Sequence, residues 1–300
     1  MSQTFESLSN SMVATIEQVS AGVVQVDARR RLPATGIVWS AEGVIVTSHH
    51  VVERDENIQI GLADGSSVAA ALLGRDPSTD VAVLKVDSTL SAPTWAELEA
   101  VRVGHLVLAL GRPHKDIQAT LGVVSAVSTV DKSRRRRRPA GNLDRYIQTD
   151  VVMYPGFSGG ALVGASGQIF GMNTSIMRGA SVAIPTPTVR YVVETLLKHG
   201  KMRRGYLGIT AQPVALPASL KADLEQETGL LVVAVEPDSP ADHSGLLLGD
   251  TLIALDDVAV TTMDDLLSLL VGERVGATVP VQLLRGGALQ TVDVTIGERA

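Results

Sequence analysis

The sequence predicts a mainly β protein built of two units, in which short antiparallel strands form a barrel or a sandwich. Apolar runs of about 4–8 residues, rich in valine, are separated by turn signals such as Ala41-Glu42-Gly43 and Asp64-Gly65. A basic, glycine-flanked segment at residues 199–205 interrupts the chain, and the strand pattern resumes after it. The regular alternation of strands and long helices that predicts a parallel α/β sheet is missing.

Length and composition agree with two units. The chain has 300 residues, a length typical of two domains, and its aromatic content of 3% requires aliphatic cores. Residues 204–300 hold 5 basic and 14 acidic side chains, a net of −9, which leaves +3 of the total −6 for the rest. The chain has no cysteine, which excludes disulfides, a thiolate nucleophile and cysteine metal sites.

No segment predicts export or membrane insertion. No window approaches the roughly 18 uninterrupted apolar residues of a spanning helix. A secretory signal opens with basic residues before an apolar core, but the first base in this chain is Arg29. We therefore expect no membrane segment and, from the chain as written, a cytoplasmic protein; an extracytoplasmic one is expected if a leader has been removed.

Residues 1–20 predict an amphipathic helix, followed by a first unit over residues 21–198. The helix either packs on its own domain or makes a subunit contact. Its apolar face recurs at helical spacing through Phe5, Leu8, Met12, Ile16 and Val19. The expected strands are Gly22–Val26, Gly36–Ser40, Val44–Ser48, Asn57–Leu62, Ser67–Leu73, Val81–Val86, Leu106–Leu110, Gly122–Thr129, Tyr146–Thr149 and Gln168–Asn173, with a closing helix over Pro187–Lys198.

After the linker 199–205, residues 206–298 predict a smaller β domain, large enough to bury its own core. Two helices interrupt its strands, and Thr261 or Thr262 is a suitable N-cap for the second. The expected strands are Leu230–Val235, Thr251–Leu255, Val279–Leu284 and Thr291–Ile296, and the expected helices are Ala241–Leu247 and Thr262–Leu270.

A glycine-rich stretch from Tyr154 to Leu162 places Ser158 among Gly156, Gly159 and Gly160. Glycine adopts backbone angles that other residues avoid, so such a turn can present a hydroxyl together with backbone N–H groups. Those are the parts of a serine nucleophile beside an oxyanion hole. The alternative is a glycine-rich turn that holds a serine by chance.

A serine nucleophile needs a base and a group that orients the base. Of the six histidines, His49 and His50 end the strand Val44–Ser48, at a position suited to face a cleft, and His114 is a weaker candidate. Asp80 begins an apolar strand, where a carboxylate is costly to bury unless a partner such as histidine donates a hydrogen bond. Ordinary loop histidines and an exposed strand-initiating aspartate are the alternatives.

Three blocks that contain these residues resemble the signature of the HtrA (Deg) serine proteases. The resemblance covers about residues 13–297 and implies a trypsin-like double β-barrel followed by one PDZ domain, a β-sandwich with two helices. The blocks are Thr47-Ser48-His49-His50-Val51-Val52, Thr79-Asp80-Val81-Ala82-Val83-Leu84-Lys85-Val86 and Gly156-Phe157-Ser158-Gly159-Gly160-Ala161-Leu162.

The resemblance implies a role for each of these residues. His50, rather than His49, aligns with the family's base, Asp80 with the orienting acid and Ser158 with the nucleophile. The N–H groups of Gly156 and Ser158 align with the oxyanion hole. No cofactor and no metal are expected.

The chain departs from the family pattern in three places. Phe157 precedes the nucleophile where the family usually has asparagine, Ser48-His49 replaces an asparagine pair, and Pro155 enters the loop without a backbone donor. The substrate pocket is expected to be apolar, because Val152 stands where trypsins carry an acid. Met153 and Ile176 are expected to line the same pocket, which favours small aliphatic side chains before the cut.

The second unit resembles an HtrA-type PDZ domain. The carboxylate-binding loop is expected at Tyr206, Leu207, Gly208 and Ile209. A peptide C-terminus then adds as a strand beside Ile209–Ala211, against the helix Thr262–Leu270.

The run Arg134–Arg138 predicts a solvated loop, because like charges in sequence repel. Contact with nucleic acid is disfavoured, since no aromatic residues or second basic patch accompany the run. By resemblance the run falls in the loop that relays the regulatory state to the active site. An anion or an acidic surface is its expected partner.

The expected function is a serine endopeptidase that cleaves unfolded or damaged proteins and binds peptide C-termini through its PDZ domain. The alternative is a chaperone or peptide-binding module on the same fold with weak or no proteolysis. Members of this family usually form trimers through an aromatic cluster near the N-terminus, and a homotrimer is expected here although only Phe5 offers such an aromatic.

Overall fold

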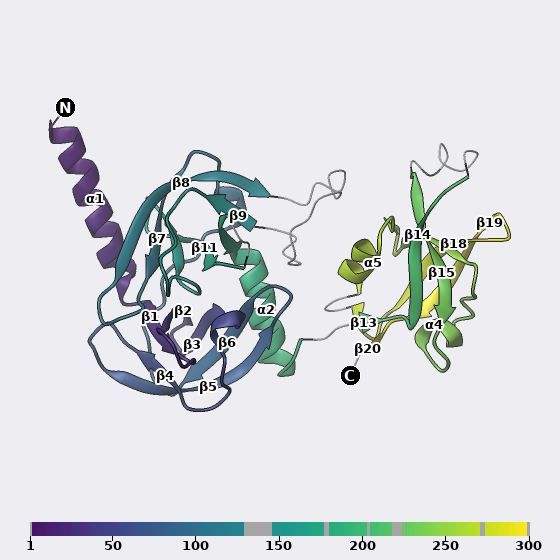
Figure 1. Ribbon diagram of the computed structural model, residues 1–300, viewed down its shortest axis with the longest axis horizontal. Helices are drawn as coiled ribbons and strands as arrows, with labels where there is room; N and C mark the ends of the chain where they lie inside the picture. The colour runs from purple at the N-terminus through teal and green to yellow at the C-terminus, as the bar shows by residue number, and fades with distance from the viewer. Residues whose placement is uncertain are drawn as a thin grey trace. The chain divides into compact units, whose positions relative to one another are not determined.

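A computed structural model describes residues 2–128, 146–176, 180–202, 205–217, 224, 226–270 and 274–298. The chain forms two compact units, Met1–Met202 and Arg203–Ala300, drawn in Figure 1. Strands dominate both units, which confirms the mainly β fold class predicted from the sequence.

After an N-terminal helix, the first unit forms a closed, six-stranded antiparallel barrel in the order β1-β2-β3-β6-β5-β4. Pairing of β1 with β4, for example Val26 with Ile60, closes the ring. The strands are β1 (Val23–Asp27), β2 (Ala34–Ser40), β3 (Val44–Ser48), β4 (Ile58–Gly61), β5 (Ser67–Asp76) and β6 (Val81–Val86).

A second closed barrel of six strands follows, in the order β10-β11-β12-β9-β8-β7. Sequence patterns missed β10 and β12, because these short strands are largely buried and lack an alternation of polar and apolar residues. The strands are β7 (Leu106–Gly111), β8 (Gln118–Ser128), β9 (Tyr146–Thr149), β10 (Ala161–Gly164), β11 (Ile169–Thr174) and β12 (Ser181–Pro185).

Strand periodicity explains how the two barrels pack. Successive side chains of a strand point to opposite faces. In β3, Ile45 therefore points into a cluster within the first barrel, while Val44 and Val46 join a cluster shared with Leu108 and Leu110 of the second. Because both faces of such strands are buried, they appear in the sequence as continuous apolar runs.

Helix α2 (Thr186–His199) packs against strands of both barrels and contributes Val192 and Leu196 to the shared core. Gly200 ends it with a positive φ of 70°, and its N–H donates to the Leu196 carbonyl. The active-site candidates described below thus lie on strands and loops that a single core holds together. Two short 3-10 helices, His49–Val51 and Leu98–Ala100, complete the unit.

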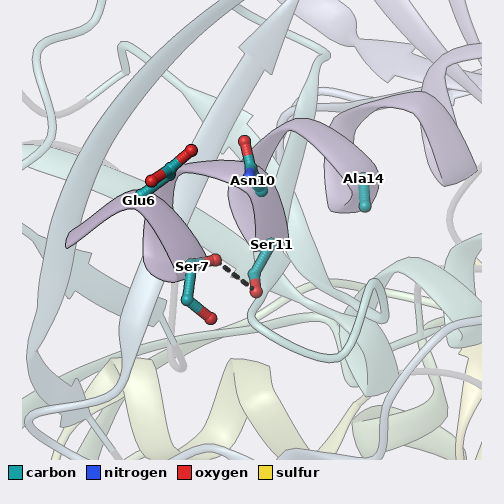
Figure 2. A pocket seen from close by; sticks show the side chains of 5 residues that line it. All are labelled: Glu6, Ser7, Asn10, Ser11 and Ala14. Carbon is teal, nitrogen blue, oxygen red and sulfur yellow. Dashed lines mark hydrogen bonds between the residues drawn. The ribbon is translucent and has the colours of Figure 1, made fainter. Parts of the chain in front are cut away.

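Helix α1 (Ser2–Ser20) is packed at its C-terminal end, where Val19 is buried and Ile16 is half-buried against the shared core. Toward its N-terminus, Phe5 is 73% exposed. A shallow hollow on α1 is lined by Glu6, Ser7, Asn10, Ser11 and Ala14 (Figure 2). All five belong to the helix itself, so the hollow is separate from the residues that carry chemistry. Within the described residues, no helix has the length and apolar character needed to cross a bilayer.

The second unit contains a six-stranded sheet, in which β14-β15-β16-β18-β19 lie in this order and β17 pairs with β16, and a separate β13-β20 pair. Ser239 caps the short helix α4, and Thr262 caps α5 in a capping box with Asp265. Helix α4 ends earlier than expected from the sequence, because Gly245 follows with a positive φ of 75°. The elements are β13 (Gly205–Tyr206), β14 (Ile209–Ala215), β15 (Thr228–Val235), α4 (Pro240–His243), β16 (Thr251–Leu255), β17 (Val258–Ala259), α5 (Met263–Leu269), β18 (Thr278–Arg285), β19 (Ala288–Thr295) and β20 (Gly297–Glu298).

Candidate active site

The carboxylate of Asp80 is fully buried at the start of β6 and orients His50. Its Oδ1 atom accepts hydrogen bonds from the His50 backbone N–H at 3.0 Å and from Nδ1 at 2.9 Å. The Asp80 carbonyl also accepts from the N–H of His49 at 3.0 Å. Asp80 adopts a φ of 59°, a left-handed conformation that aspartate tolerates better than most residues. This local turn aims the side chain back at the histidine.

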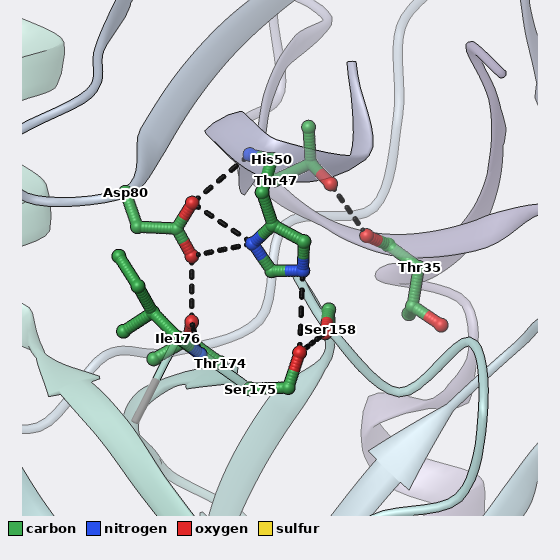
Figure 3. A network of polar contacts seen from close by, with 8 residues as sticks. All are labelled: Thr35, Thr47, His50, Asp80, Ser158, Thr174, Ser175 and Ile176. Carbon is green, nitrogen blue, oxygen red and sulfur yellow. Dashed lines mark hydrogen bonds and ion pairs between the residues drawn. The ribbon is translucent and has the colours of Figure 1, made fainter. Parts of the chain in front are cut away.

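Thr174, at the end of β11 in the second barrel, completes the shell around Asp80. Its Oγ1 donates to Oδ2 at 2.6 Å (Figure 3). Burial by itself raises the pKa of Asp80, but the bonds from His50 and Thr174 outweigh it and hold the pKa below its usual value. The carboxylate is therefore ionised at neutral pH and can steady a charged imidazole. Sequence reasoning missed Thr174, since no motif connects it with residue 80.

Ser175 lies between the candidate nucleophile, Ser158, and the candidate base, His50. Its Oγ is 3.0 Å from Ser158 Oγ and 3.3 Å from His50 Nε2, as Figure 3 shows. Within the described residues, no direct hydrogen bond joins Ser158 to His50. The structure thus brings His50, Asp80 and Ser158 into one network, with a hydroxyl that sequence reasoning missed inserted between them.

The loop before Ser158 is a hydrogen-bonded turn. The Phe157 N–H donates to the Tyr154 carbonyl at 3.0 Å, and Gly156 has a φ of 92°. These are the features of a type II turn, which favours proline at its second position and glycine at its third. Pro155 therefore suits the loop. The N–H groups of Gly156 and Ser158 have no partner among the described residues, so both are free to bind an oxygen of a ligand.

Phe157 anchors this loop in the second barrel. The ring is fully buried, and it meets the Tyr154 ring edge-on with centroids 5.7 Å apart. A side chain on Gly111 would collide with it, since a Cβ there would lie 2.5 Å from the Phe157 ring. The aromatic residue that departs from the family pattern thus points into the core, away from the Ser158 hydroxyl.

The other candidate histidines lie outside this network. Burial, and then the charge of Arg75, lower the pKa of His49, whose buried Nδ1 has no partner within the described residues. His114 is exposed. Only His50 contacts both Asp80 and the serine pair.

The expected pocket residues differ in exposure. Val152 is 55% exposed. Met153 and Ile176 are half-buried and pack against different core clusters. The apolar specificity pocket remains a prediction. Arg134–Arg138 lie outside the described residues, so their expected partner also remains a prediction.

The loop expected to bind carboxylate joins β13 to β14. Two of its carbonyls accept hydrogen bonds from the rest of the domain: that of Leu207 from the Ala241 N–H and that of Gly208 from the Glu236 N–H, each at 2.8 Å. The N–H groups of Leu207 and Gly208 have no partner among the described residues. Gly208 has a φ of 79° and no room for a side chain, since a Cβ would lie 2.2 Å from that of Ser239.

No group of His, Asp or Glu residues that could hold a metal ion occurs in the described part of the chain.

Comparison with known proteins decides the family. A family model of the trypsin-like peptidase domain matches residues 34–172, and one of the PDZ domain matches residues 205–296. The solved HtrA-type protease AlgW, in complex with a tripeptide, is 30% identical; the match covers 96% of this chain and 97% of that one, with a TM-score of 0.78. The chain belongs to the HtrA family. The sequence resemblance is thereby confirmed.

Other relatives of this HtrA protein extend the comparison. A serine endoprotease structure from Yersinia pestis is 31% identical, over 95% of this chain and 97% of that chain, with a TM-score of 0.76. A probable periplasmic serine endoprotease, DegP-like, from Pseudomonas putida (strain W619) is 36% identical over 271 residues, 88% of this chain and 55% of the relative. The chain thus spans about half the length of the curated relatives that it matches.

The cytoplasmic location expected from the sequence is contradicted by these relatives. Those from Pseudomonas putida, Halomonas elongata and Ectopseudomonas mendocina are all named periplasmic, which points to an extracytoplasmic location. The expectation failed for a physical reason: a leader that is cleaved on export leaves no mark on the folded chain, so the sequence of a folded chain does not report the compartment.

Replacing Ser175 by alanine tests the inserted hydroxyl. Ser158 then loses its competing partner and can donate to His50, so we expect fluorophosphonate labelling of Ser158 to accelerate by up to about 10-fold, because a neutral hydrogen bond contributes about 0.5–1.5 kcal/mol. Ser125→Ala, at an exposed position of β8, is the matched control and should leave the rate unchanged. Slower labelling of Ser175→Ala would show instead that Ser175 assists the proton transfer.

Proposed function

We propose that this HtrA protein is a serine endopeptidase that cleaves unfolded or damaged protein chains through an acyl-enzyme. One observation carries the proposal: Asp80, His50, Ser175 and Ser158 form a continuous hydrogen-bonded network beside the N–H groups of Gly156 and Ser158, which have no partner among the described residues. Family membership supports it, since the relatives are named serine endoproteases.

The reaction follows from this geometry. The Ser158 hydroxyl turns from Ser175 to His50 Nε2, which takes its proton as the oxygen attacks the scissile carbonyl. The negative charge that develops on the carbonyl oxygen is stabilised by the N–H groups of Gly156 and Ser158. His50 returns the proton to the leaving amine, and water then hydrolyses the ester by the same steps.

Asp80 makes this proton transfer productive. By accepting from Nδ1, it fixes the tautomer in which Nε2 is the free base, and its negative charge stabilises the imidazolium. The bond from Thr174 holds the second carboxylate oxygen, so the carboxylate cannot rotate away from the ring.

The substrates follow from what both units can hold. An extended peptide can add to the edge of β14 that no described strand pairs with, with its terminal carboxylate on the Leu207 and Gly208 N–H groups and apolar side chains toward α5. Ile209 and Ala211 pack against the core that includes Leu266 of α5, which supports an apolar groove there. Val152, Met153 and Ile176 would select small aliphatic residues before the cut.

We further propose a homotrimer, in which the exposed Phe5 on α1 contributes to the contact between subunits. The alternative function, a peptide-binding module with weak proteolysis, is favoured by a single observation: among the described residues, the Ser158 hydroxyl is hydrogen-bonded to Ser175 and not to His50. A protein with this arrangement would bind unfolded chains but cleave them slowly.

The nucleophile is tested by Ser158→Ala in a casein digest. We expect the cleavage rate to fall by at least about 10³-fold, because removal of the nucleophile from a triad abolishes acyl transfer. Ser166→Ala, at an exposed serine on the turn after β10, should cleave like the wild type. Equal cleavage by wild type and Ser158→Ala would reject the protease function and leave the binding module.

The PDZ loop is tested with one peptide that ends in valine, prepared with a free carboxylate and as its amide. The full-length Ser158→Ala protein is used so that the peptide stays intact. We expect amidation to weaken binding by about 10-fold or more, since hydrogen bonds to a charged group contribute about 1.5–3 kcal/mol. Equal affinity for both forms would contradict carboxylate recognition by this loop.

A further inference from the structure

Thr35 on β2 is fully buried and joins the first barrel to the loop that contains Ser158. Both its backbone and its side chain are engaged. Its N–H donates to the Ser158 carbonyl at 3.2 Å, its Oγ1 donates to the Gly156 carbonyl at 2.7 Å, the Arg112 N–H donates to Oγ1 at 2.8 Å, and Thr47 Oγ1 donates to its carbonyl at 2.7 Å.

The direction of these bonds is determined by chemistry. A backbone N–H can only donate and a carbonyl can only accept. Because Arg112 donates to the Thr35 hydroxyl, the single hydroxyl proton must point at the Gly156 carbonyl. Buried in a fully satisfied network, a bond of this kind is stronger than in water and costly to lose.

The bond acts on the middle of the oxyanion loop. The peptide between Gly156 and Phe157 is planar, and it lies between the two N–H groups that the proposed mechanism uses. Thr35 holds its oxygen, and the Tyr154 carbonyl accepts from its N–H at 3.0 Å. With that plane held at both ends, the backbone between the Gly156 and Ser158 N–H groups has less freedom to rotate.

Thr35 is itself held firmly, because its partner Arg112 is anchored by its side chain. The buried guanidinium donates to the carbonyls of Val23 at 2.7 Å, Lys115 at 2.7 Å and Ser20 at 3.0 Å. The Arg112 backbone therefore cannot follow the loop if the loop moves, and Thr35 remains a fixed reference.

We propose that Thr35 is a positioning residue for the oxyanion hole: through its hydroxyl it holds the Gly156–Phe157 peptide so that the N–H groups of Gly156 and Ser158 face the substrate carbonyl. The proposal rests on the proposed function. Thr35 is fully buried, and its hydroxyl acts through the Gly156 carbonyl. Its effect is therefore on the transition state, where charge develops on the carbonyl oxygen, and not on the affinity for the substrate.

The test compares Thr35→Val with Thr35→Ser on a small chromogenic peptide substrate. Valine keeps the shape of threonine but removes the donor to the Gly156 carbonyl and the acceptor of the Arg112 N–H. We expect Thr35→Val to lower kcat by about 10²-fold, as the loss of an oxyanion-hole donor does, with KM within about 3-fold of the wild type. Thr35→Ser keeps the hydroxyl and should retain kcat within about 3-fold.

Thr186→Val is the matched control for lost stability. Thr186, the first residue of α2, is also fully buried, and its hydroxyl donates to the Phe170 carbonyl. This variant should lower the unfolding temperature and leave kcat unchanged.

The outcomes separate the two proposals. An inactive wild type rejects the proposed function, whereas an active wild type with an equally active Thr35→Val rejects the role of Thr35. A rise in KM without a fall in kcat also overturns it. If Thr35→Val does not fold, a fall of about 10²-fold in Thr35→Ser overturns the proposal, because that variant keeps the hydroxyl.

Discussion

The buried carboxylate of Asp80 is the constraint on which the rest of the site depends. A charge inside a protein is costly unless partners satisfy it, and here the partners come from both barrels: His50 from the first and Thr174 from the second. The site therefore exists only when the two barrels are packed together. The shared aliphatic core, extended by α2, supplies that packing.

A second set of contacts between the two barrels holds the loop that contains Ser158. Thr35 contacts this loop from the first barrel, while Phe157 holds it in the core of the second. The base and the loop are thus positioned against each other by two independent sets of contacts. Ser175 contacts both Ser158 and His50, so rotation of the Ser158 hydroxyl determines whether it pairs with Ser175 or donates to His50.

Local chemistry in the sequence was enough to make Asp80, Ser158 and the pair His49-His50 candidates, because a strand end, a costly buried carboxylate and a glycine-rich turn are each visible in a few residues. The choice of His50 over His49 came from the family resemblance. Thr174 and Thr35 were not predictable in this way, since their partners lie 94 and 121 residues away in the chain. Pro155 was misleading in the sequence, because a residue without a backbone N–H suggests a defect in the oxyanion loop. The structure shows that the loop is a turn in which proline is favoured at this position. The short strands β10 and β12 were not predicted for a related reason: they are buried on both faces, so polar and apolar residues do not alternate along them.

The central claim is that the N–H groups of Gly156 and Ser158 stabilise the negative oxygen of an adduct formed on the Ser158 hydroxyl. A crystal structure of the protein after reaction with a fluorophosphonate tests it most directly. We expect phosphorus on Ser158 Oγ, with one phosphoryl oxygen about 2.7–3.1 Å from the nitrogens of both Gly156 and Ser158, while Asp80 keeps its hydrogen bonds to His50 and Thr174. An adduct whose phosphoryl oxygen lies beyond reach of both nitrogens, or a label on another residue, would contradict it.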